Sequence, residues 1–433
     1  MEIFLLVFLF LSEILCAMFC IISKSNQQKV RSIFRISLFF TFGLMIITSL
    51  IHWNFRWYGF ACLLLIWAIL GTISLFRKNQ THRTFNRRRI IGNAIFMSLL
   101  ALITLTPALI FPQYSPLKPT GKFDVETKID TYIDSNRIET YSDANQYRKI
   151  TVQYWFPKTS NGKFPLLIFS HGSFGIRTSN LSLYKELASN GYVVCSIDHT
   201  YQSLFSTDIE GNLSLLDKGF FSEVISEDAH TNKQLSFEYY QKWMGIRASD
   251  INFVIEHIIA KTNSGSKDTV LKLVNPSRIG LMGHSLGGSA VLSVARMRND
   301  VDAVMALESP FLGDIVGVKN DEFVWNEETF PIPILNIYSD STWDRLEDLP
   351  QYAENADLLT NDDAISFNIH FKGARHMTLT DLALSSPFLT RVIDGQRASM
   401  DARYSLTTIN KLAVEFFDCY LKNICPFSSN DSY

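Results

Sequence analysis

The sequence predicts an α/β domain on a mostly parallel sheet, preceded by four transmembrane helices. Three observations predict it: four long apolar runs fill the first 111 residues, strand-like and helical segments alternate afterwards, and one strand ends in a Gly-x-Ser-x-Gly turn. A chain of 433 residues has room for about two to four domains. We therefore expect a membrane domain over residues 1–111, a linker over residues 112–122 and an α/β domain over residues 123–433.

The net charge of −2 combines two unlike parts of the chain. Residues 1–111 hold eleven Lys and Arg and two acids, a net charge of +9, whereas the remainder holds 29 Lys and Arg and 40 acids, a net charge of −11. An acidic main domain argues against nucleic acid as a partner, because phosphate binding needs a positive surface. A hydrophobic content of 47% and only six Cys argue against disorder and against a disulfide-built small fold.

The apolar runs cover residues 3–22, 36–51, 57–76 and 90–111. A membrane-spanning helix needs about 20 mostly apolar residues, so we expect the short second run to extend into its flanks. Glu13 lies near the middle of the first run. A carboxyl at that depth is costly, so we expect Glu13 to face other helices or to be protonated.

Positive residues predict the orientation of these helices. They gather after the first run and after the third, while the gap between the second and third runs holds only Arg56. Cytoplasmic loops collect Lys and Arg. We therefore expect a multi-pass protein of the cell membrane, with the bilayer as a partner, and with both termini and the whole α/β domain on the non-cytoplasmic face.

The remaining chain alternates strands with helices. Nearly continuous runs of Val, Ile, Leu and Phe are typical of strands buried on both faces of a parallel sheet, connected by right-handed βαβ crossovers. Residues 210–233 fit neither pattern, and we expect a surface insertion there. The expected strands are residues 150–156, 165–170, 192–197, 278–282, 303–307, 332–337 and 367–371, and the expected helices are residues 184–189, 237–261, a segment beginning after Ser285, and 406–421.

The turn Gly283-His284-Ser285-Leu286-Gly287-Gly288 joins the strand at 278–282 to a helix. In a turn this tight, the positions two before and two after the serine cannot carry side chains, and the serine is held in a strained conformation with its hydroxyl above the sheet. We predict that Ser285 is a nucleophile, activated by a base.

The base should follow the nucleophile in the chain, since α/β-hydrolases order their triad as Ser, acid, His. Only His370 and His376 come after Ser285. His370 lies inside a predicted strand and reads as a packed residue, whereas His376 follows Gly373 on a loop. We therefore predict that His376 is the base.

Two carboxylates could orient that imidazole. Glu308 follows the strand at 303–307, and Asp340 follows the strand at 332–337, so both lie at carboxyl ends of strands. Either could instead be a cap or a turn acceptor.

The oxyanion hole needs two backbone N–H groups. One is expected from Leu286, the residue after the nucleophile, and the other from the loop after an earlier strand. That loop is His171-Gly172-Ser173, in which Gly172 allows close approach of substrate. The N–H of Ser173 is the expected second donor.

These segments together resemble the platelet-activating factor acetylhydrolases and their bacterial α/β-hydrolase relatives. The resemblance covers roughly residues 117–425 and excludes the four apolar runs. It implies an α/β-hydrolase fold and a calcium-independent serine esterase that removes short or oxidised acyl chains from phospholipids. It is carried by PLLIFSHG (165–172), Arg177, LASNG (187–191), GHSLGG (283–288), ALE (306–308) and KGARH (372–376).

The resemblance also implies site roles. The family's acid closes the strand directly after the nucleophile helix, which matches Glu308, where the family usually has Asp; Asp340 stays as the alternative. Ser285 and His376 match the family's nucleophile and base, and Ser173 and Leu286 fall at its oxyanion positions.

The leading hypothesis is thus a membrane-anchored serine ester hydrolase acting on phospholipid-like esters. A carboxylesterase or dienelactone-type hydrolase for soluble or polymer esters is the alternative, and a catalytically inactive sensor is the alternative from another class. The sequence has no metal-binding, P-loop or dinucleotide motif, so no cofactor or metal is expected. Cys419 and Cys425 could form a disulfide outside the cytoplasm.

Overall fold

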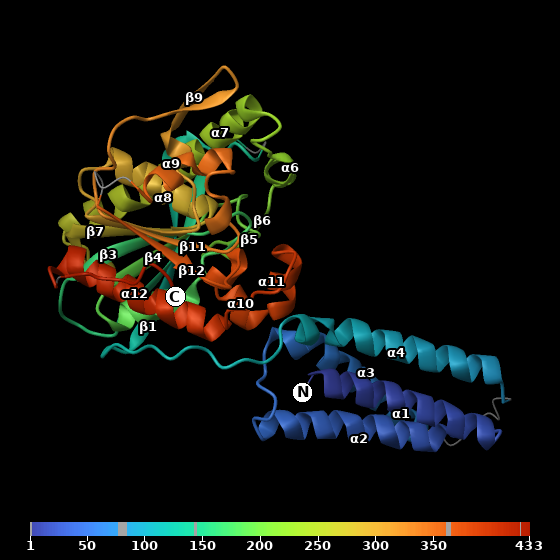
Figure 1. Ribbon diagram of the computed structural model, residues 1–433. Coiled ribbons are helices and arrows are strands. Elements are labelled where there is room, and N and C mark those ends of the chain that lie inside the picture. Colours follow the sequence, from blue (N-terminus) through green and yellow to red (C-terminus); the bar gives the residue numbers. More distant parts are fainter. Residues whose placement is uncertain (1, 77–84, 143–144, 361–364, 425) are drawn as a thin grey trace. The chain divides into compact units, whose positions relative to one another are not determined.

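A computed structural model describes residues 2–76, 85–142, 145–360, 365–424 and 426–433. The chain divides into two compact units, one of residues 1–115 with 385–389, and one of residues 116–384 with 390–433. Figure 1 traces their helices and strands. We describe each unit by itself.

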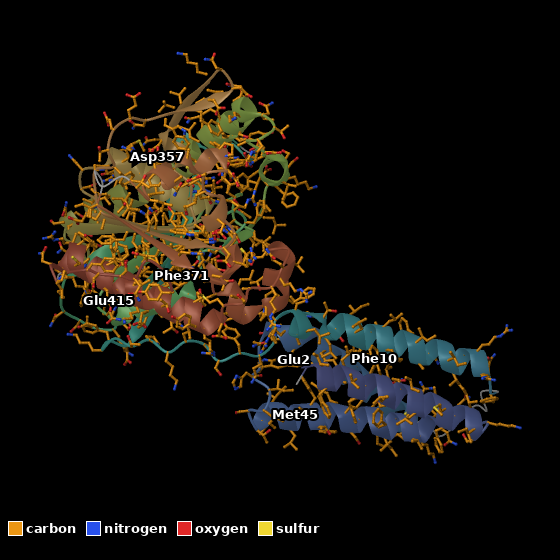
Figure 2. The ribbon with its side chains drawn as sticks, viewed as in Figure 1. Glu2, Phe10, Met45, Asp357, Phe371 and Glu415 are labelled. Atoms are coloured by element: carbon orange, nitrogen blue, oxygen red, sulfur yellow. The ribbon has the colours of Figure 1, made fainter. Side chains whose placement is uncertain are left out.

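The first unit is built from four helices that are long and apolar enough to cross a membrane. They are α1 (Glu2–Ile22), α2 (Gln28–Ile47), α3 (Tyr58–Phe76) and α4 (Arg87–Ile110). Their outward surface is apolar, with Ile3, Phe40 and Phe76 exposed by 70%, 67% and 81%, and the side chains drawn along them, Phe10 and Met45 among these, are mostly carbon (Figure 2). Such a surface suits lipid rather than water.

The second apolar run, residues 36–51, extends into its N-terminal flank as expected, but the helix does not reach the C-terminal bound of the run. Helix α2 begins at Gln28 and ends at Ile47, so it starts eight residues earlier and stops four residues earlier. Lys29, Arg31 and Arg35 therefore belong to the helix and not to the preceding loop. Long cationic side chains near a helix end can reach the polar interface, so they do not prevent the helix from starting there.

Glu13 faces the other helices, as expected. Its side chain is 7% exposed and pairs with Arg35 at 3.8 Å. The guanidinium of Arg35 also lies 5.3 Å from the ring centroid of Trp67 in α3. The carboxyl thus has an opposite charge beside it between the helices, where an isolated charge would be costly.

The second unit is built on an eight-stranded sheet with the order β1-β2-β4-β3-β7-β8-β11-β12. Strands from β4 to β12 are parallel, while β1 and β2 are antiparallel. All seven predicted strands are confirmed: β2 (Tyr147–Pro157), β3 (Phe164–Ser170), β4 (Val193–Asp198), β7 (Val274–His284), β8 (Ala303–Leu307), β11 (Ile334–Ser339) and β12 (Ser366–Phe371).

Helices cover both faces of this sheet. Along β3, Leu166 and Ile168 pack toward α7 (Lys233–Asn263) and α8 (Leu286–Met297), while Leu167 and Phe169 pack toward α5 (Leu181–Ser189) and α12 (Ala402–Lys422). Successive side chains of a strand point to opposite faces of the sheet, so β3 contributes to the apolar cores on both faces. The predicted helices at 184–189, after Ser285, at 237–261 and at 406–421 are confirmed, and the described residues also form the short helices α9 (Ala353–Asp357), α10 (Leu382–Ser385) and α11 (Pro387–Ile393).

Several elements were not predicted. The long edge strand β1 (Val125–Ile138) is mostly exposed or half-buried, with no regular alternation. Two hairpins join β5 (Phe205–Thr207) to β6 (Leu213–Leu215) and β9 (Ile315–Lys319) to β10 (Glu322–Trp325). Residues 210–233, which we expected to form a surface insertion because they fit neither pattern, include β6 and α6 (Lys218–Ser226). Asp217 caps α6 by accepting from the N–H of Phe220 at 2.8 Å, a local signal for its start.

The last residues of the chain lie along the β12 edge of the sheet. The N–H of His370 donates to the carbonyl of Asp431 at 2.9 Å, and the N–H of Tyr433 donates to the carbonyl of His370 at 3.0 Å. Lys372 donates to Tyr433 at 3.0 Å. Cys419 is disulfide-bonded, and Cys425, its expected partner, lies outside the described residues.

Candidate active site

Ser285 lies in the sharp turn between β7 and α8. Its backbone has φ 54° and ψ −128°, a conformation that is costly for a residue with a side chain and is found mainly at functional sites. A Cβ on Gly283 would lie 2.5 Å from the carbonyl carbon of Gly287, and one on Gly287 would lie 2.1 Å from the carbonyl oxygen of Ser170. The turn therefore needs glycine two residues before and two residues after the serine.

Glu308 follows β8 and is fully buried. Its carboxylate accepts hydrogen bonds from the Ser339 hydroxyl at 2.8 Å and from the Thr342 hydroxyl at 2.5 Å. Its Oε2 lies 3.2 Å from Nδ1 of His376. These three donors leave the buried charge well solvated by protein groups, which is what a buried carboxylate requires.

The pKa values of this pair move in opposite directions. Burial raises the pKa of Glu308, but the hydrogen bond and charge of His376, with Thr342 and Ser339, outweigh it and hold that pKa below its ordinary value. Burial lowers the pKa of His376, but the hydrogen bond and charge of Glu308 outweigh it and raise that pKa. The pair therefore favours a carboxylate that holds the Nδ1–H of the imidazole.

Asp340, the alternative acid, contacts the other histidine. Its Oδ1 lies 2.8 Å from Nε2 of His370, and its Oδ2 accepts from the N–H of Gly373 at 3.0 Å. The ring of His370 stacks on Trp343 at 4.8 Å between centroids. The structure thus brings Glu308 to His376, and Asp340 to His370.

His284 links the nucleophile turn to His376. Its ring centroid lies 4.5 Å from that of His376, and its Nε2 lies 3.2 Å from the carbonyl oxygen of His376. Burial and the charge of His376 lower the pKa of His284 well below its ordinary value, so a neutral ring donates to that carbonyl. Within the described residues, no hydrogen bond is recorded between the Ser285 hydroxyl and the His376 ring.

The expected oxyanion loop packs against this turn. A Cβ on Gly172 would lie 2.9 Å from Nδ1 of His284 and 3.2 Å from Cβ of Ser285. Across the part of the chain that the structure describes, the N–H of Ser173 has no hydrogen-bond partner. Leu286 is the first residue of α8, where helix N–H groups lack partners within the helix.

Sequence reasoning missed the groups that hold the acid and the base. Ser339 and Thr342 bind Glu308, and the hydroxyl of Ser341 accepts from the N–H of His376 at 3.1 Å. Ser339 ends β11, and Ser341 and Thr342 follow it on the other side of Asp340. Such a run of hydroxyl side chains at the carboxyl end of a strand is the signal that could have found them.

Comparisons with known proteins identify the family and the fold. The sequence profile of the family described as "Platelet-activating factor acetylhydrolase, isoform II" matches residues 149–431. A platelet-activating factor acetylhydrolase of Gallus gallus is 24% identical over 62% of this chain and 65% of its own, and one of Cavia porcellus is 22% identical over 63% and 61%. A probable 1-alkyl-2-acetylglycerophosphocholine esterase of Arthroderma benhamiae is 27% identical over 43% and 42%.

In each case the match spans less than two thirds of the curated relative. Among solved structures, a ferulic acid esterase from Streptomyces cinnamoneus aligns with a TM-score of 0.55 and 19% identity, over 72% of this chain and 95% of that one. At this identity the likeness shows the fold, which is the α/β-hydrolase fold with a mostly parallel sheet.

Proposed function

Because the chain belongs to the platelet-activating factor acetylhydrolase isoform II family, we propose that it is a membrane-anchored serine ester hydrolase. Ser285 is the nucleophile, His376 the base and Glu308 the acid that orients it. The hydrogen bond of 3.2 Å between His376 and the fully buried Glu308 is the observation that carries this proposal. A buried carboxylate bound to Nδ1 leaves Nε2 as the atom that can accept a proton.

The proposed reaction proceeds through an acyl-enzyme. Oγ of Ser285 attacks the ester carbonyl while His376 takes its proton, and the N–H groups of Ser173 and Leu286 bind the resulting oxyanion. Collapse of this intermediate breaks the C–O bond, and His376 protonates the leaving alcohol. Water then attacks the acyl carbonyl while His376 takes its proton. Collapse of this second intermediate breaks the bond to Oγ of Ser285, His376 returns the proton to Oγ, and the carboxylic acid leaves.

We propose phospholipid or lipid-like esters with short acyl groups as substrates. One relative is named a platelet-activating factor acetylhydrolase and another a probable 1-alkyl-2-acetylglycerophosphocholine esterase, and an apolar surface adjoins the oxyanion loop. The N–H of Leu204 donates to Gly175 at 3.2 Å, and the rings of Phe174 and Phe221 lie 5.3 Å apart. Several apolar side chains of residues 204–225, which form this surface, are exposed: Leu204, Phe205, Ile209, Leu213, Leu215, Phe221 and Ile225.

We also propose that residues 1–111 anchor the enzyme in the membrane, with the hydrolase domain outside the cytoplasm. The apolar surface of α1 to α4 supports the anchor, and the distribution of Lys and Arg supports the orientation. Lys411 is a suitable reporter because its side chain is 73% exposed. A Lys411→Cys variant should react with a membrane-impermeant maleimide in intact cells. Reaction only after lysis would show that the hydrolase domain faces the cytoplasm, opposite to the proposed orientation.

Labelling by a fluorophosphonate probe tests the activity. Wild type should be labelled, and Ser285→Ala should not. Ser293→Ala, which removes a hydroxyl two turns along the same helix, should be labelled like wild type. Release of acyl groups should be faster from vesicles of short-chain phospholipid than from water-soluble esters. A folded, unlabelled wild type would contradict any hydrolase role, and a preference for soluble esters would favour a carboxylesterase.

A further inference from the structure

A second array of serine, histidine and aspartate lies beneath the oxyanion loop. Oγ of Ser170 lies 2.8 Å from Nε2 of His199, and Nδ1 of His199 lies 2.9 Å from Oδ2 of Asp250. All three residues are 0% exposed. The order of hydrogen bonds is that of a catalytic triad, but substrate has no access to these groups, so the array serves another purpose.

Arg148 fixes the charges in this array. Its Nε and NH2 donate to the two oxygens of Asp250 at 3.0 and 2.6 Å. Burial raises the pKa of Asp250, but Arg148 and His199 outweigh it and hold that pKa well below its ordinary value. Burial and the charge of Arg247 lower the pKa of His199 to about 4, against the opposing effect of Asp250.

These charge states define the direction of each hydrogen bond. A charged Asp250 can only accept, so neutral His199 carries its proton on Nδ1 and donates it to Asp250. Nε2 of His199 then has a lone pair, which accepts from the hydroxyl of Ser170. The Ser170 side chain is thereby held in one rotamer at the carboxyl end of β3.

Arg247 holds the next residue of the loop. Its side chain is fully buried, and its NH1 donates to the carbonyl oxygen of His171, while its Nε donates to Oε1 of Gln202 at 2.7 Å. The carbonyls of Ser170 and His171 also face Gly287, since a Cβ there would lie 2.1 and 2.4 Å from them. The loop is therefore held by the hydrogen bond from Arg247 on one side and by its packing against the nucleophile turn on the other.

We propose that Asp250, His199 and Ser170, together with Arg247, are positioning residues that hold the 171–173 loop so that the N–H of Ser173 points at the developing oxyanion. This role rests on the proposed function, because it matters only for a reaction in which a carbonyl oxygen gains charge. The network touches no substrate and acts through the backbone of the loop. Its loss should weaken binding of the transition state and leave binding of the ground-state ester nearly unchanged.

Ser170→Ala in the full-length chain tests this role, because it removes a single hydroxyl from the network. Removing an oxyanion donor outright lowers turnover by about 10²–10³, so a displaced donor should lower kcat by about 10- to 100-fold. KM should change by less than about twofold. The Ki of a trifluoromethyl ketone, whose hemiketal oxygen mimics the oxyanion, should rise by the same factor as kcat/KM falls.

Ser196→Ala is the matched control. Ser196 is equally buried on the adjacent strand β4, beside Phe169 of β3, and its hydroxyl bonds Tyr184 rather than the loop. This variant should keep both kcat and Ki. Ser170→Cys, which fills nearly the same space with a weak donor, should lower kcat in the same direction even if the alanine variant does not fold.

Two results would overturn the positioning role. One is an unchanged Ki in a folded Ser170→Ala or Ser170→Cys protein, and the other is an equal loss in Ser196→Ala. Either would leave the proposed function intact so long as wild type hydrolyses esters and is labelled at Ser285. Absence of labelling in wild type would overturn the proposed function and this role together.

Discussion

Replacing Glu308 by Gln tests the assignment of the acid most directly. The amide occupies nearly the same volume, but only one of its two terminal atoms can accept a hydrogen bond. The carboxylate accepts from Ser339, Thr342 and His376, so the amide cannot satisfy the same three donors. An amide N–H facing His376 would force Nδ1 to accept and would move the ring proton to Nε2, where it blocks transfer from Ser285.

The expected magnitude follows from this change of tautomer. The corresponding change of a triad aspartate to its amide in a serine protease lowers kcat about 10⁴-fold, which is about 5.5 kcal/mol in the barrier. We expect kcat of Glu308→Gln to fall by about 10³–10⁴ on a soluble chromogenic ester, with the unfolding temperature measured alongside.

Asp340→Asn is the matched control. It makes the same change in a carboxylate that pairs with His370 at 2.8 Å. Its kcat should stay within about tenfold of wild type, because Glu308 and not Asp340 sets the tautomer of His376. A loss of activity in Asp340→Asn with more than a tenth retained in Glu308→Gln would refute the reasoning and assign the acid to Asp340.

Three further predictions concern the base, the turn and the surface. Glu308 raises the pKa of His376 above its ordinary value of 6.5, and His376 must be neutral to act as a base, so kcat/KM should rise with pH through an apparent pKa above 6.5. The residual activity of Glu308→Gln should rise at a lower pH, because the carboxylate that raises this pKa is gone. Identical pH profiles for the two proteins would contradict the coupling of Glu308 and His376. Gly287→Ala should lower the unfolding temperature and abolish labelling, because its Cβ would lie 2.1 Å from the Ser170 carbonyl; normal labelling would show that the turn can relax. Ile225→Asp, at a side chain 67% exposed, should slow release from phospholipid vesicles while sparing soluble esters, and equal rates on vesicles would remove this surface from lipid binding.

The parallel core of the fold could be predicted because its strands are nearly continuous apolar runs. Strand β1 could not be, since it lies at the sheet edge and most of its residues are exposed or half-buried without a regular period, as in a polar loop. An extension of α2 beyond its apolar run could be expected, but its exact start could not be predicted, because the cationic residues of its first turns lower the local hydropathy although their long side chains can reach the polar interface. The short hairpin β5–β6 was missed although its turn carries local signals, since Oδ1 of Asp208 accepts from the N–H groups of Glu210 and Asn212 and Gly211 has φ +89°.

The candidate site divides in the same way. Ser285 was predictable because its strand, glycines and helix are adjacent in the sequence. The choice between Glu308 and Asp340 was not, because both end strands, and only the packing of β11 beside β8 and β12 decides which imidazole each meets. His199 and Asp250 are 51 positions apart, and nothing local marks them as partners.

The short segment at residues 431–433 alters how this sheet can meet other molecules. An open final strand presents unused N–H and C=O groups that can recruit a strand from a neighbouring chain. Here the chain's own end occupies part of that border, through His370 and Lys372. Crowded copies of the protein thereby lose one template for β-aggregation, and a truncation that removes these three residues would restore it.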